Sequence, residues 1–169
     1  MRLTTNQGMT IPEYNKCVEV FSDNLYRFIL KNLKNEEQAK DVVQDSFTKM
    51  WLKVEEVDFQ KAKSYLFTTG YRTMIDLIRR EQKRGDIEKA DMNKLADHSQ
   101  YSDLQEILHK AIARLPETQQ HVIMLRDYEG YSYDEIGEIT DLNPAQVKVY
   151  IYRARVSLKK YLVKMDYLL

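Results

Sequence analysis

Residues 132–158 read SYDEIGEITDLNPAQVKVYIYRARVSL, and this stretch decides the architecture of the C-terminal half of the chain. Ser132 is followed three residues later by Glu135, a capping-box spacing that predicts the start of a short helix. The run Asp141-Leu142-Asn143 predicts a tight turn, after which a longer helix begins. A short helix, a turn of three or four residues and a longer basic helix together form the layout of a helix-turn-helix.

The rotation of the longer helix follows from its apolar residues, because groups three or four positions apart lie on one side of a helix. The residues expected inside are Val147, Ile151, Ala154, Leu158 and Leu162. The outward residues near the start of the helix, where a recognition helix meets base edges, are Lys148, Val149, Tyr152 and Arg153. The two cations can donate to guanine, and the other two side chains can contact thymine methyl groups. Residues 143–164 hold six basic and no acidic residues, which favours a DNA-contacting face over a basic amphipathic helix on a bundle.

Upstream of this motif, the sequence predicts two further helices and a linker. Apolar spacing predicts a helix over 104–115, and Pro116 begins another that runs to Tyr128. Residues 85–103 are polar, acidic and aperiodic, which is typical of a linker. We therefore expect two small helical domains, at 10–84 and 104–165, joined by a flexible acidic linker at 85–103.

The sequence of the N-terminal half predicts three helices. Pro12 suits the first turn of a helix whose apolar stripe spans 13–33. Asn35 is expected to cap a second helix, which has acidic residues in its first turn. Trp51 lies on the apolar side of this second helix, so core packing is its expected role, whereas the opposite face is polar. A third helix is predicted over 62–84.

The third predicted helix interleaves aromatic and basic residues. Aromatic rings stack on bases and cations follow phosphates in sites that bind single-stranded nucleic acid. The composition leaves open the alternative that the rings are core and the cations are solvated. The aromatic residues are Tyr65, Phe67 and Tyr71, and the basic ones are Lys61, Lys63, Arg72, Arg79, Arg80, Lys83 and Arg84.

Composition excludes several classes of protein. Five glycines and three prolines among 169 residues are too few for a turn-dense β-sandwich or barrel, so an all-α fold is expected. No apolar run is long enough to cross a membrane, and no signal peptide is visible. Cys17 is the only cysteine, which excludes an internal disulfide and suggests a reducing, cytoplasmic location. With three scattered histidines and one cysteine, a metal site is not expected.

Two sets of motifs resemble a known family, the extracytoplasmic-function (ECF) sigma factors of the sigma-70 superfamily. Residues 115–162 resemble region 4 of that family through Leu115-Pro116, Leu125-Arg126, Glu129-Gly130, Ser132-Tyr133-Asp134-Glu135-Ile136, Val147-Lys148 and Arg153-Ala154-Arg155. The N-terminal half resembles region 2 through Asp41-Val42-Val43-Gln44-Asp45-Ser46-Phe47 up to Trp51, Ser64-Tyr65-Leu66-Phe67, Ile75-Asp76 and Arg79-Arg80. The two sets occur in the family's order on either side of the linker.

The resemblance implies a sigma subunit that directs core RNA polymerase to promoters, reads the −35 element with the helix-turn-helix and melts the −10 element. The residues that map onto binding of the polymerase β′ clamp helices are Asp41, Gln44 and Asp45. Those that map onto capture of the −10 strand are Tyr65, Phe67, Tyr71, Arg72, Arg79 and Arg80. For the −35 element, Lys148, Val149, Tyr152 and Arg153 map onto base contacts, and Arg126, Tyr133 and Gln146 map onto phosphate contacts.

The implied partners are core RNA polymerase, through its β′ clamp helices and β flap, and promoter DNA, with no cofactor and no membrane insertion. Whether an anti-sigma factor also binds is left open by the sequence. Arg72 stands where the family usually has Asn, and Gln146, Val149 and Tyr150 replace its common Thr, Ser and Arg. We therefore expect the preferred promoter sequence of this chain to differ from those of other family members.

Two other classes of function agree less well with the sequence. A stand-alone helix-turn-helix regulator of duplex DNA would need a ligand pocket or phosphoacceptor in residues 1–84, and the sequence shows neither. An enzyme is not expected, because no Gly-rich phosphate loop, paired catalytic carboxylates or Ser/His/Asp arrangement stands out.

Overall fold

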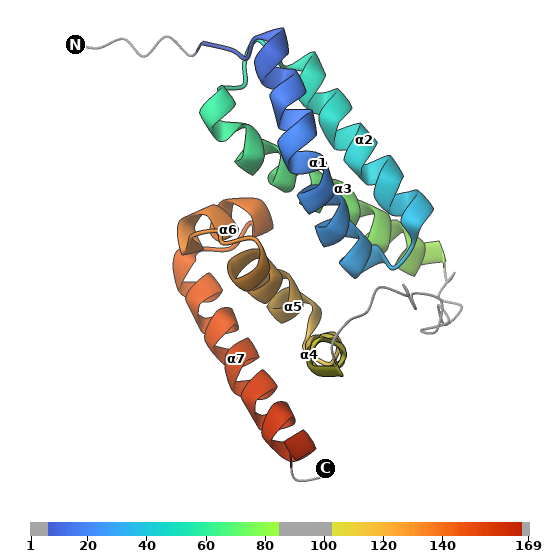
Figure 1. Ribbon diagram of the computed structural model, residues 1–169, viewed down its shortest axis with the longest axis vertical. Coiled ribbons are helices and arrows are strands. Elements are labelled where there is room, and N and C mark those ends of the chain that lie inside the picture. The colour runs from blue at the N-terminus through green and yellow to red at the C-terminus, as the bar shows by residue number, and fades with distance from the viewer. Residues whose placement is uncertain (1–6, 85–102, 167–169) are drawn as a thin grey trace, which may run out of the picture. The chain divides into compact units, whose positions relative to one another are not determined.

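The computed structural model describes residues 7–84 and 103–166, and every regular element within these two ranges is a helix (Figure 1). The chain divides into two compact units, Met1–Lys94 and Leu95–Leu169. The predicted all-α class with two helical domains is confirmed. The predicted linker lies outside the described residues except for Asp103, which begins a helix. Within the described ranges no helix is both long and apolar enough to cross a membrane.

The first unit consists of three long helices, each of which the sequence predicted. They are α1 (Ile11–Leu33), α2 (Glu36–Leu52) and α3 (Ala62–Arg84), the last preceded by a 3₁₀ turn, η1 (Phe59–Lys61). The Thr10 hydroxyl accepts from the Glu13 N–H while the Glu13 carboxylate accepts from the Thr10 N–H, a complete capping box. Asn35 caps α2 as expected, because its side chain accepts from the Gln38 N–H at 3.0 Å.

The core of the first unit forms where the three helices pack on one another. Its largest fully buried side chains are Leu25, Phe28, Ile29, Met50, Leu66, Phe67 and Met74. Gly70 allows the helices to approach closely, since a Cβ there would lie 2.9 Å from Leu25 Cδ1. Cys17 is fully buried, and burial raises the pKa of its thiol, in agreement with a structural rather than a reactive role.

Trp51 differs from its predicted role in the core. Its side chain is 44% exposed, and its ring packs edge-to-face with the Tyr14 ring at a centroid distance of 4.9 Å. The cause is rotational: Trp51 follows the fully buried Met50 by one residue, so it points about 100° away from the core. The expectation of core packing for Trp51 was therefore wrong.

The second unit contains α4 (Asp103–Ala113), α5 (Glu117–Ile123), a π-helical turn η2 (Met124–Tyr128), α6 (Tyr133–Thr140) and α7 (Pro144–Asp166). The helix predicted from Pro116 to Tyr128 is thus α-helical only in its first part. The backbone N–H of Glu129 donates to the Met124 carbonyl at 3.2 Å, five residues back, which widens the last turn. This wide turn leads into Gly130, whose φ of 73° ends the helix.

The core of the second unit gathers α5 and the two helices of the helix-turn-helix. Val122, Leu125, Ile136, Val147 and Ala154 have no exposed surface. His121 is a buried polar residue of the same unit, at 3% exposure, and burial lowers its pKa to about 4.

Candidate nucleic-acid interface

The helix-turn-helix is built from local hydrogen bonds that the sequence encodes. Ser132 and Glu135 form the predicted capping box at the start of α6. Asp141 ends that helix in the left-handed conformation at φ 60°, and the Leu142 N–H donates to the Gly137 carbonyl at 3.1 Å. A Cβ on Gly137 would lie 2.6 Å from the Leu142 carbonyl oxygen, so glycine allows the turn to pass close to α6.

The rotation of α7 is the one predicted from its apolar spacing. Val147, Ile151 and Ala154 are at most 1% exposed, whereas Leu158 is half-buried. On the opposite side Tyr152 is 69% and Val149 is 44% exposed, and the exposed cations are Lys148 and Arg153. Neither cation forms an ion pair with any residue that the structure describes. Both are therefore available to an anionic or hydrogen-bonding partner.

Gln146, predicted to contact a phosphate, caps the start of α7 in the structure. Its side-chain Oε1 accepts from the Asn143 backbone N–H at 3.0 Å, and its own backbone N–H donates to Asn143 Oδ1 at 2.8 Å. This reciprocal pair is a capping box, and Pro144 occupies the first turn. Neither of these two bonds uses the side-chain nitrogen of Gln146, and the side chain is exposed. The cap is therefore compatible with a contact between that nitrogen and a phosphate.

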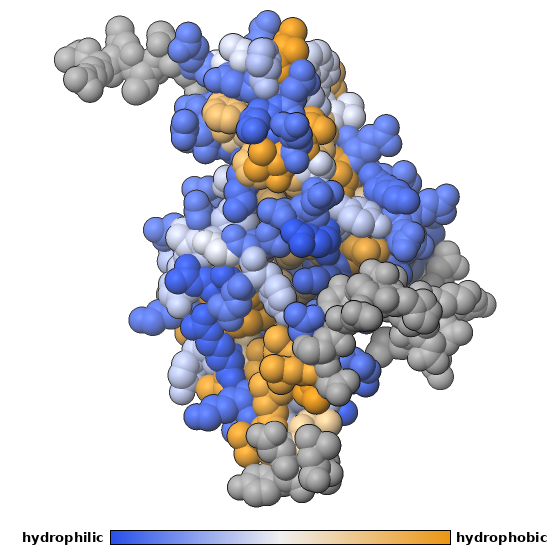
Figure 2. Space-filling model, in the orientation of Figure 1, coloured by the Kyte–Doolittle hydropathy of each residue, from blue (hydrophilic) through white to orange (hydrophobic). Residues whose placement is uncertain are grey.

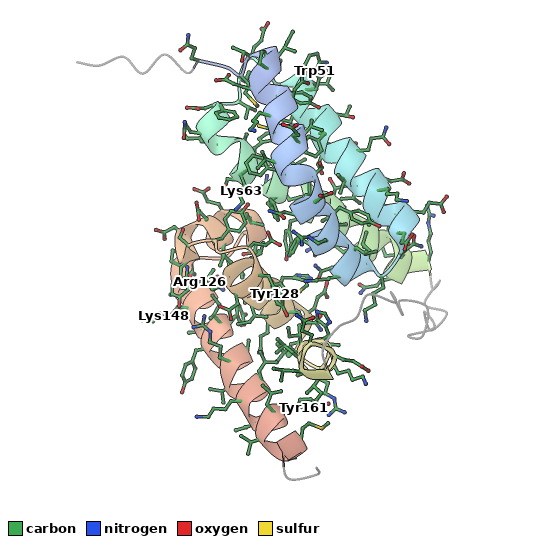
Figure 3. The ribbon with its side chains drawn as sticks, viewed as in Figure 1. Trp51, Lys63, Arg126, Tyr128, Lys148 and Tyr161 are labelled. Atoms are coloured by element: carbon green, nitrogen blue, oxygen red, sulfur yellow. The ribbon has the colours of Figure 1, made fainter. Side chains whose placement is uncertain are left out.

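Arg126, which is labelled in Figure 3, contacts Tyr133, and both were predicted on phosphates. The Arg126 guanidinium lies 5.0 Å from the centroid of the Tyr133 ring and donates to the Tyr131 carbonyl at 2.8 Å. Arg126 is half-buried, so part of its hydrogen-bonding capacity holds the loop before α6 in place. The two side chains join η2 to the first turn of α6.

Sequence reasoning missed an ion pair that links η2 to α7. The Arg155 guanidinium lies 2.8 Å from Asp127 Oδ1, and this pairing raises the pKa of Arg155. The sequence shows an arginine in the basic helix and an aspartate before Gly130. It does not show that the two residues pair, because 28 residues separate them. The pair anchors the middle of α7 to the element before the turn.

On α3, three of the six residues predicted to contact the −10 strand share one side of the helix. Tyr65, Arg72 and Arg79 recur at steps of seven residues, so they lie within about 40° of one direction. Tyr65 is half-buried, with its hydroxyl 3.5 Å from the Lys49 carbonyl, while both arginines are exposed. The exposed Arg80 and half-buried Tyr71 flank this stripe on either side.

Phe67 is not part of that surface. It has no exposed area, and its ring packs against Phe28 of α1 at a centroid distance of 5.8 Å. Helical phase explains the difference, because Phe67 is next to buried Leu66 and one turn before buried Gly70. The prediction that Phe67 contacts DNA was wrong: this ring holds α3 against α1.

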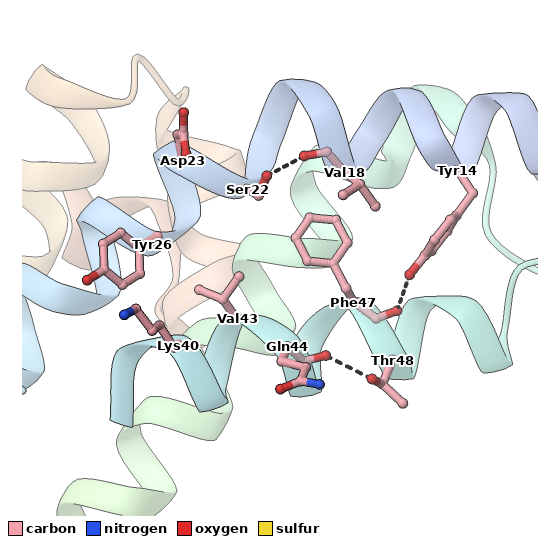
Figure 4. A pocket seen from close by; sticks show the side chains of 10 residues that line it. All are labelled: Tyr14, Val18, Ser22, Asp23, Tyr26, Lys40, Val43, Gln44, Phe47 and Thr48. Carbon is pink, nitrogen blue, oxygen red and sulfur yellow. Dashed lines mark hydrogen bonds between the residues drawn. The ribbon is translucent and has the colours of Figure 1, made fainter. Parts of the chain in front are cut away.

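The predicted polymerase-binding face of α2 is accessible. Asp41 and Gln44 are exposed, and Asp45 Oδ2 lies 2.8 Å from Lys49 Nζ at the surface. Gln44 also lines a groove of about 520 Å³ between α1 and α2, and Phe47 lies on its apolar side (Figure 4). The Tyr14 hydroxyl donates to the Phe47 carbonyl at 3.0 Å, which holds the two helices together at one end of the groove.

Comparison with known proteins assigns the family. The family model of sigma-70 region 2 matches residues 17–84, and that of sigma-70 region 4 matches residues 105–158. The chain belongs to the sigma-70 family. The RNA polymerase sigma factor SigV of Bacillus subtilis is 32% identical over 155 residues, which cover 89% of this chain and 91% of SigV. The ECF RNA polymerase sigma factor SigM of the same organism is 26% identical over 156 residues, covering 89% and 94%.

Solved structures agree with this assignment of an ECF sigma factor. The sigma factor RpoE of Bartonella quintana, crystallised with the anti-sigma factor NepR, superposes with a TM-score of 0.75. It shares 25% identity and covers 90% of this chain and 98% of its own. The protein is therefore a promoter-recognising RNA polymerase sigma factor of the ECF type, with the helix-turn-helix in region 4 and α1–α3 in region 2. The stand-alone regulator does not account for region 2.

Proposed function

We propose that three exposed surfaces divide the work of this sigma factor, one for each macromolecular contact. The outward side of α7, with Lys148, Val149, Tyr152 and Arg153, reads bases of the −35 element. The outward stripe of α3, with Tyr65, Arg72 and Arg79 flanked by Tyr71 and Arg80, holds the melted −10 strand. The polar face of α2, with Asp41, Gln44 and Asp45, binds the β′ clamp helices of core polymerase.

The observation that carries the −35 assignment is the rotation of α7. Val147, Ile151 and Ala154 fix one side of the helix in the core, so the opposite side is presented to solvent along its first turns. Figure 2 shows hydrophilic residues over much of this helix. Val149 and Tyr152 are exposed on the same side as Lys148 and Arg153. Cations beside apolar contacts are the combination that distinguishes G·C from A·T pairs in the major groove.

The −10 assignment rests on the accessible chemistry of α3. Melting a promoter requires unstacked bases to be captured, which costs a few kcal/mol and is offset by stacking on aromatic rings. Tyr65 and Tyr71 are half-buried and so offer part of each ring, while Arg72, Arg79 and Arg80 are exposed to phosphates. With Phe67 in the core, the tyrosines are the aromatic contacts that remain from the predicted set.

The partners follow from these surfaces and from the relatives. Core RNA polymerase would bind through its β′ clamp helices at α2 and through its β flap at region 4. The co-crystal of the similar RpoE with an anti-sigma factor supports an anti-sigma factor as a further partner of this chain. Acting on polymerase and promoters, the protein would work in the cytoplasm, without a cofactor or catalysis of its own.

The test of the −35 assignment is a promoter-variant binding matrix for Arg153→Ala and Arg153→Lys in holoenzyme. The arginine fork can pair two acceptors of one guanine, whereas lysine is a point charge. We expect Arg153→Ala to weaken the preferred site by roughly 1–3 kcal/mol and to relax the choice at one base pair. Arg153→Lys should keep part of the affinity but lose the same discrimination. A uniform loss across all base positions would make Arg153 a phosphate contact and refute the assignment.

A further inference from the structure

A second cationic surface lies on the C-terminal half of α7, beyond the residues that face bases. Lys159, Lys160 and Lys164 of α7 and Arg114 at the end of α4 line a shallow hollow of about 520 Å³, together with Tyr161 and Val163. We call this set the α7 basic hollow. None of its members was included in the predicted −35 or −10 surfaces.

The charge of the α7 basic hollow is not neutralised within the described part of the chain. Its three lysines are exposed and form no ion pair with any described residue. Lys110, in the last turn of α4 before Arg114, differs, because its ammonium lies 2.6 Å from Glu106. Like charges held close together repel one another, so such a cluster is more favourable when an anion is bound.

One of the four cations is held in position. The Arg114 guanidinium lies 4.5 Å from the centroid of the Tyr161 ring, over its face (Figure 3 labels Tyr161). A cation–π contact of this kind restricts the arginine while leaving its N–H donors free for hydrogen bonds. The hollow therefore combines an oriented planar donor with three exposed ammonium groups, a set suited to several phosphate groups rather than to a single carboxylate.

The hollow continues the base-facing side of α7. Lys159 and Lys160 follow Tyr152 and Arg153 by seven residues, which on a helix means a shift of about 20° and roughly 10 Å along the axis. The major groove is only about 12 Å wide. A helix that reads bases with its first turns therefore reaches a sugar-phosphate strand at the groove edge near Lys159 and Lys160.

We propose that the α7 basic hollow binds the phosphate backbone of duplex DNA at the edge of the −35 element. This contact adds affinity that does not depend on base sequence, whereas Lys148 and Arg153 choose the sequence. The proposal rests on the proposed placement of the first turns of α7 in the major groove. The ligand is the phosphodiester of double-stranded DNA, and a protein partner with an acidic surface is the occupant that the experiment must exclude.

The experiment compares two triple variants of the full chain, Lys159→Gln/Lys160→Gln/Lys164→Gln and Lys159→Arg/Lys160→Arg/Lys164→Arg. Each is titrated with a fluorescent duplex carrying a −35 site selected from a random library, at several salt concentrations. Every lost phosphate contact should lower the slope of log affinity against log salt by about 0.9, so the glutamine variant should lose two to three units of slope. Its affinity at 0.1 M salt should fall at least roughly tenfold. The arginine variant keeps the charge and should retain the slope.

The base-preference matrix separates this proposal from the −35 assignment on which it rests. The glutamine variant should show an unchanged matrix with uniformly lower affinity, while Arg153→Ala should relax one position. An unchanged salt slope, or relaxation at one base position, would overturn the proposal. An unchanged slope together with weaker holoenzyme assembly would assign the hollow to a protein partner and overturn it as well. If Arg153→Ala relaxed no position while the slope still fell, the backbone contact would stand and the base readout would fail.

Discussion

Among single residues, His121 carries the clearest consequence for stability. It is 3% exposed in the core of region 4, and burial lowers its pKa from 6.5 to about 4. The unfolded chain therefore binds a proton near pH 6.5, while the folded chain resists protonation until about pH 4. The contribution of neutral His121 is fully present above pH 6.5 and is lost as the pH falls from 6.5 towards 4.

We expect region 4 to lose about 2 kcal/mol more between pH 7.5 and pH 5.0 in the native chain than in a His121→Leu variant. Urea unfolding followed by circular dichroism at the two pH values measures this difference. The fluorescence of Trp51, the only tryptophan, follows region 2 alone and serves as the control. Equal losses in the two proteins would show that His121 does not carry the pH dependence.

Single residues also show which local contacts can be predicted from the sequence and which cannot. The Asn143–Gln146 spacing of three is visible in the sequence and could have revealed the capping box that the structure contains. The role of Arg126 could not be predicted in the same way. Its acceptor is a backbone carbonyl, that of Tyr131, and its position depends on the π-helical turn before Gly130. No residue type signals such a turn.

At the scale of elements, the turn between α6 and α7 depends on Gly137. An alanine there would favour the helix by about 1 kcal/mol through its intrinsic propensity. Its Cβ, however, would lie 2.6 Å from the Leu142 carbonyl oxygen, and a backbone atom cannot move aside by changing rotamer. The steric conflict should therefore outweigh the gain in propensity.

We expect Gly137→Ala to destabilise region 4 by about 1–3 kcal/mol and to weaken binding to a −35 duplex. Glu138→Ala, the next and exposed position of α6, is the matched control and should change stability by less than about 0.5 kcal/mol. Urea unfolding by circular dichroism and a duplex titration check both effects. A Gly137→Ala protein as stable as the control would mean that the turn has room which the structure does not show.

The polar face of α2 yields a second prediction for an element. Asp41 and Asp45 are not needed for the fold, since Asp41 is exposed and the ion pair of Asp45 lies at the surface. The double change Asp41→Ala/Asp45→Ala should leave stability within about 0.5 kcal/mol and sharply weaken capture of core polymerase. Glu19→Ala/Glu55→Ala removes the same charge from exposed sites and should capture polymerase normally. Undiminished capture by the first variant would remove this face from the interface.

Helical phase decided which predictions about elements succeeded. For α7 an unbroken apolar spacing fixed the rotation, and the burial of Val147, Ile151 and Ala154 confirms it. For α3, the alternation of aromatic and basic residues predicts a DNA contact for Phe67, whereas the helical phase turns this ring into the core. The buried neighbours of Phe67, Leu66 and Gly70, are apolar or small residues one and three positions away. Phasing α3 on Leu66 and Met74 would have placed Phe67 inside.

At the scale of the whole molecule, the chain is two units with separate cores. The helices with the most extensive packing pair within a unit, α1 with α2 and α3 in region 2, and α5 and α6 with α7 in region 4. The division itself was predictable, because residues 85–103 lack apolar periodicity. The net charge of zero gave no guide to function, since the 26 basic and 26 acidic residues are distributed unevenly along the chain.

Separate cores predict that residues 1–94 and 95–169 fold as two independent polypeptides. The sum of their circular dichroism spectra should equal the spectrum of the intact chain.

Transcription from a promoter should nevertheless require that the two units are covalently connected. Once one unit has bound, the connection holds the other unit near its own site at an effective concentration of up to about 1 mM. At micromolar concentrations, the mixed units should therefore give at least roughly tenfold less run-off transcript with core polymerase than the intact chain. Transcript should rise as the concentration of the 95–169 unit increases. A mixture as active as the intact chain at low concentration would show that polymerase and promoter alone align the two regions, and that the connection contributes nothing to promoter selection.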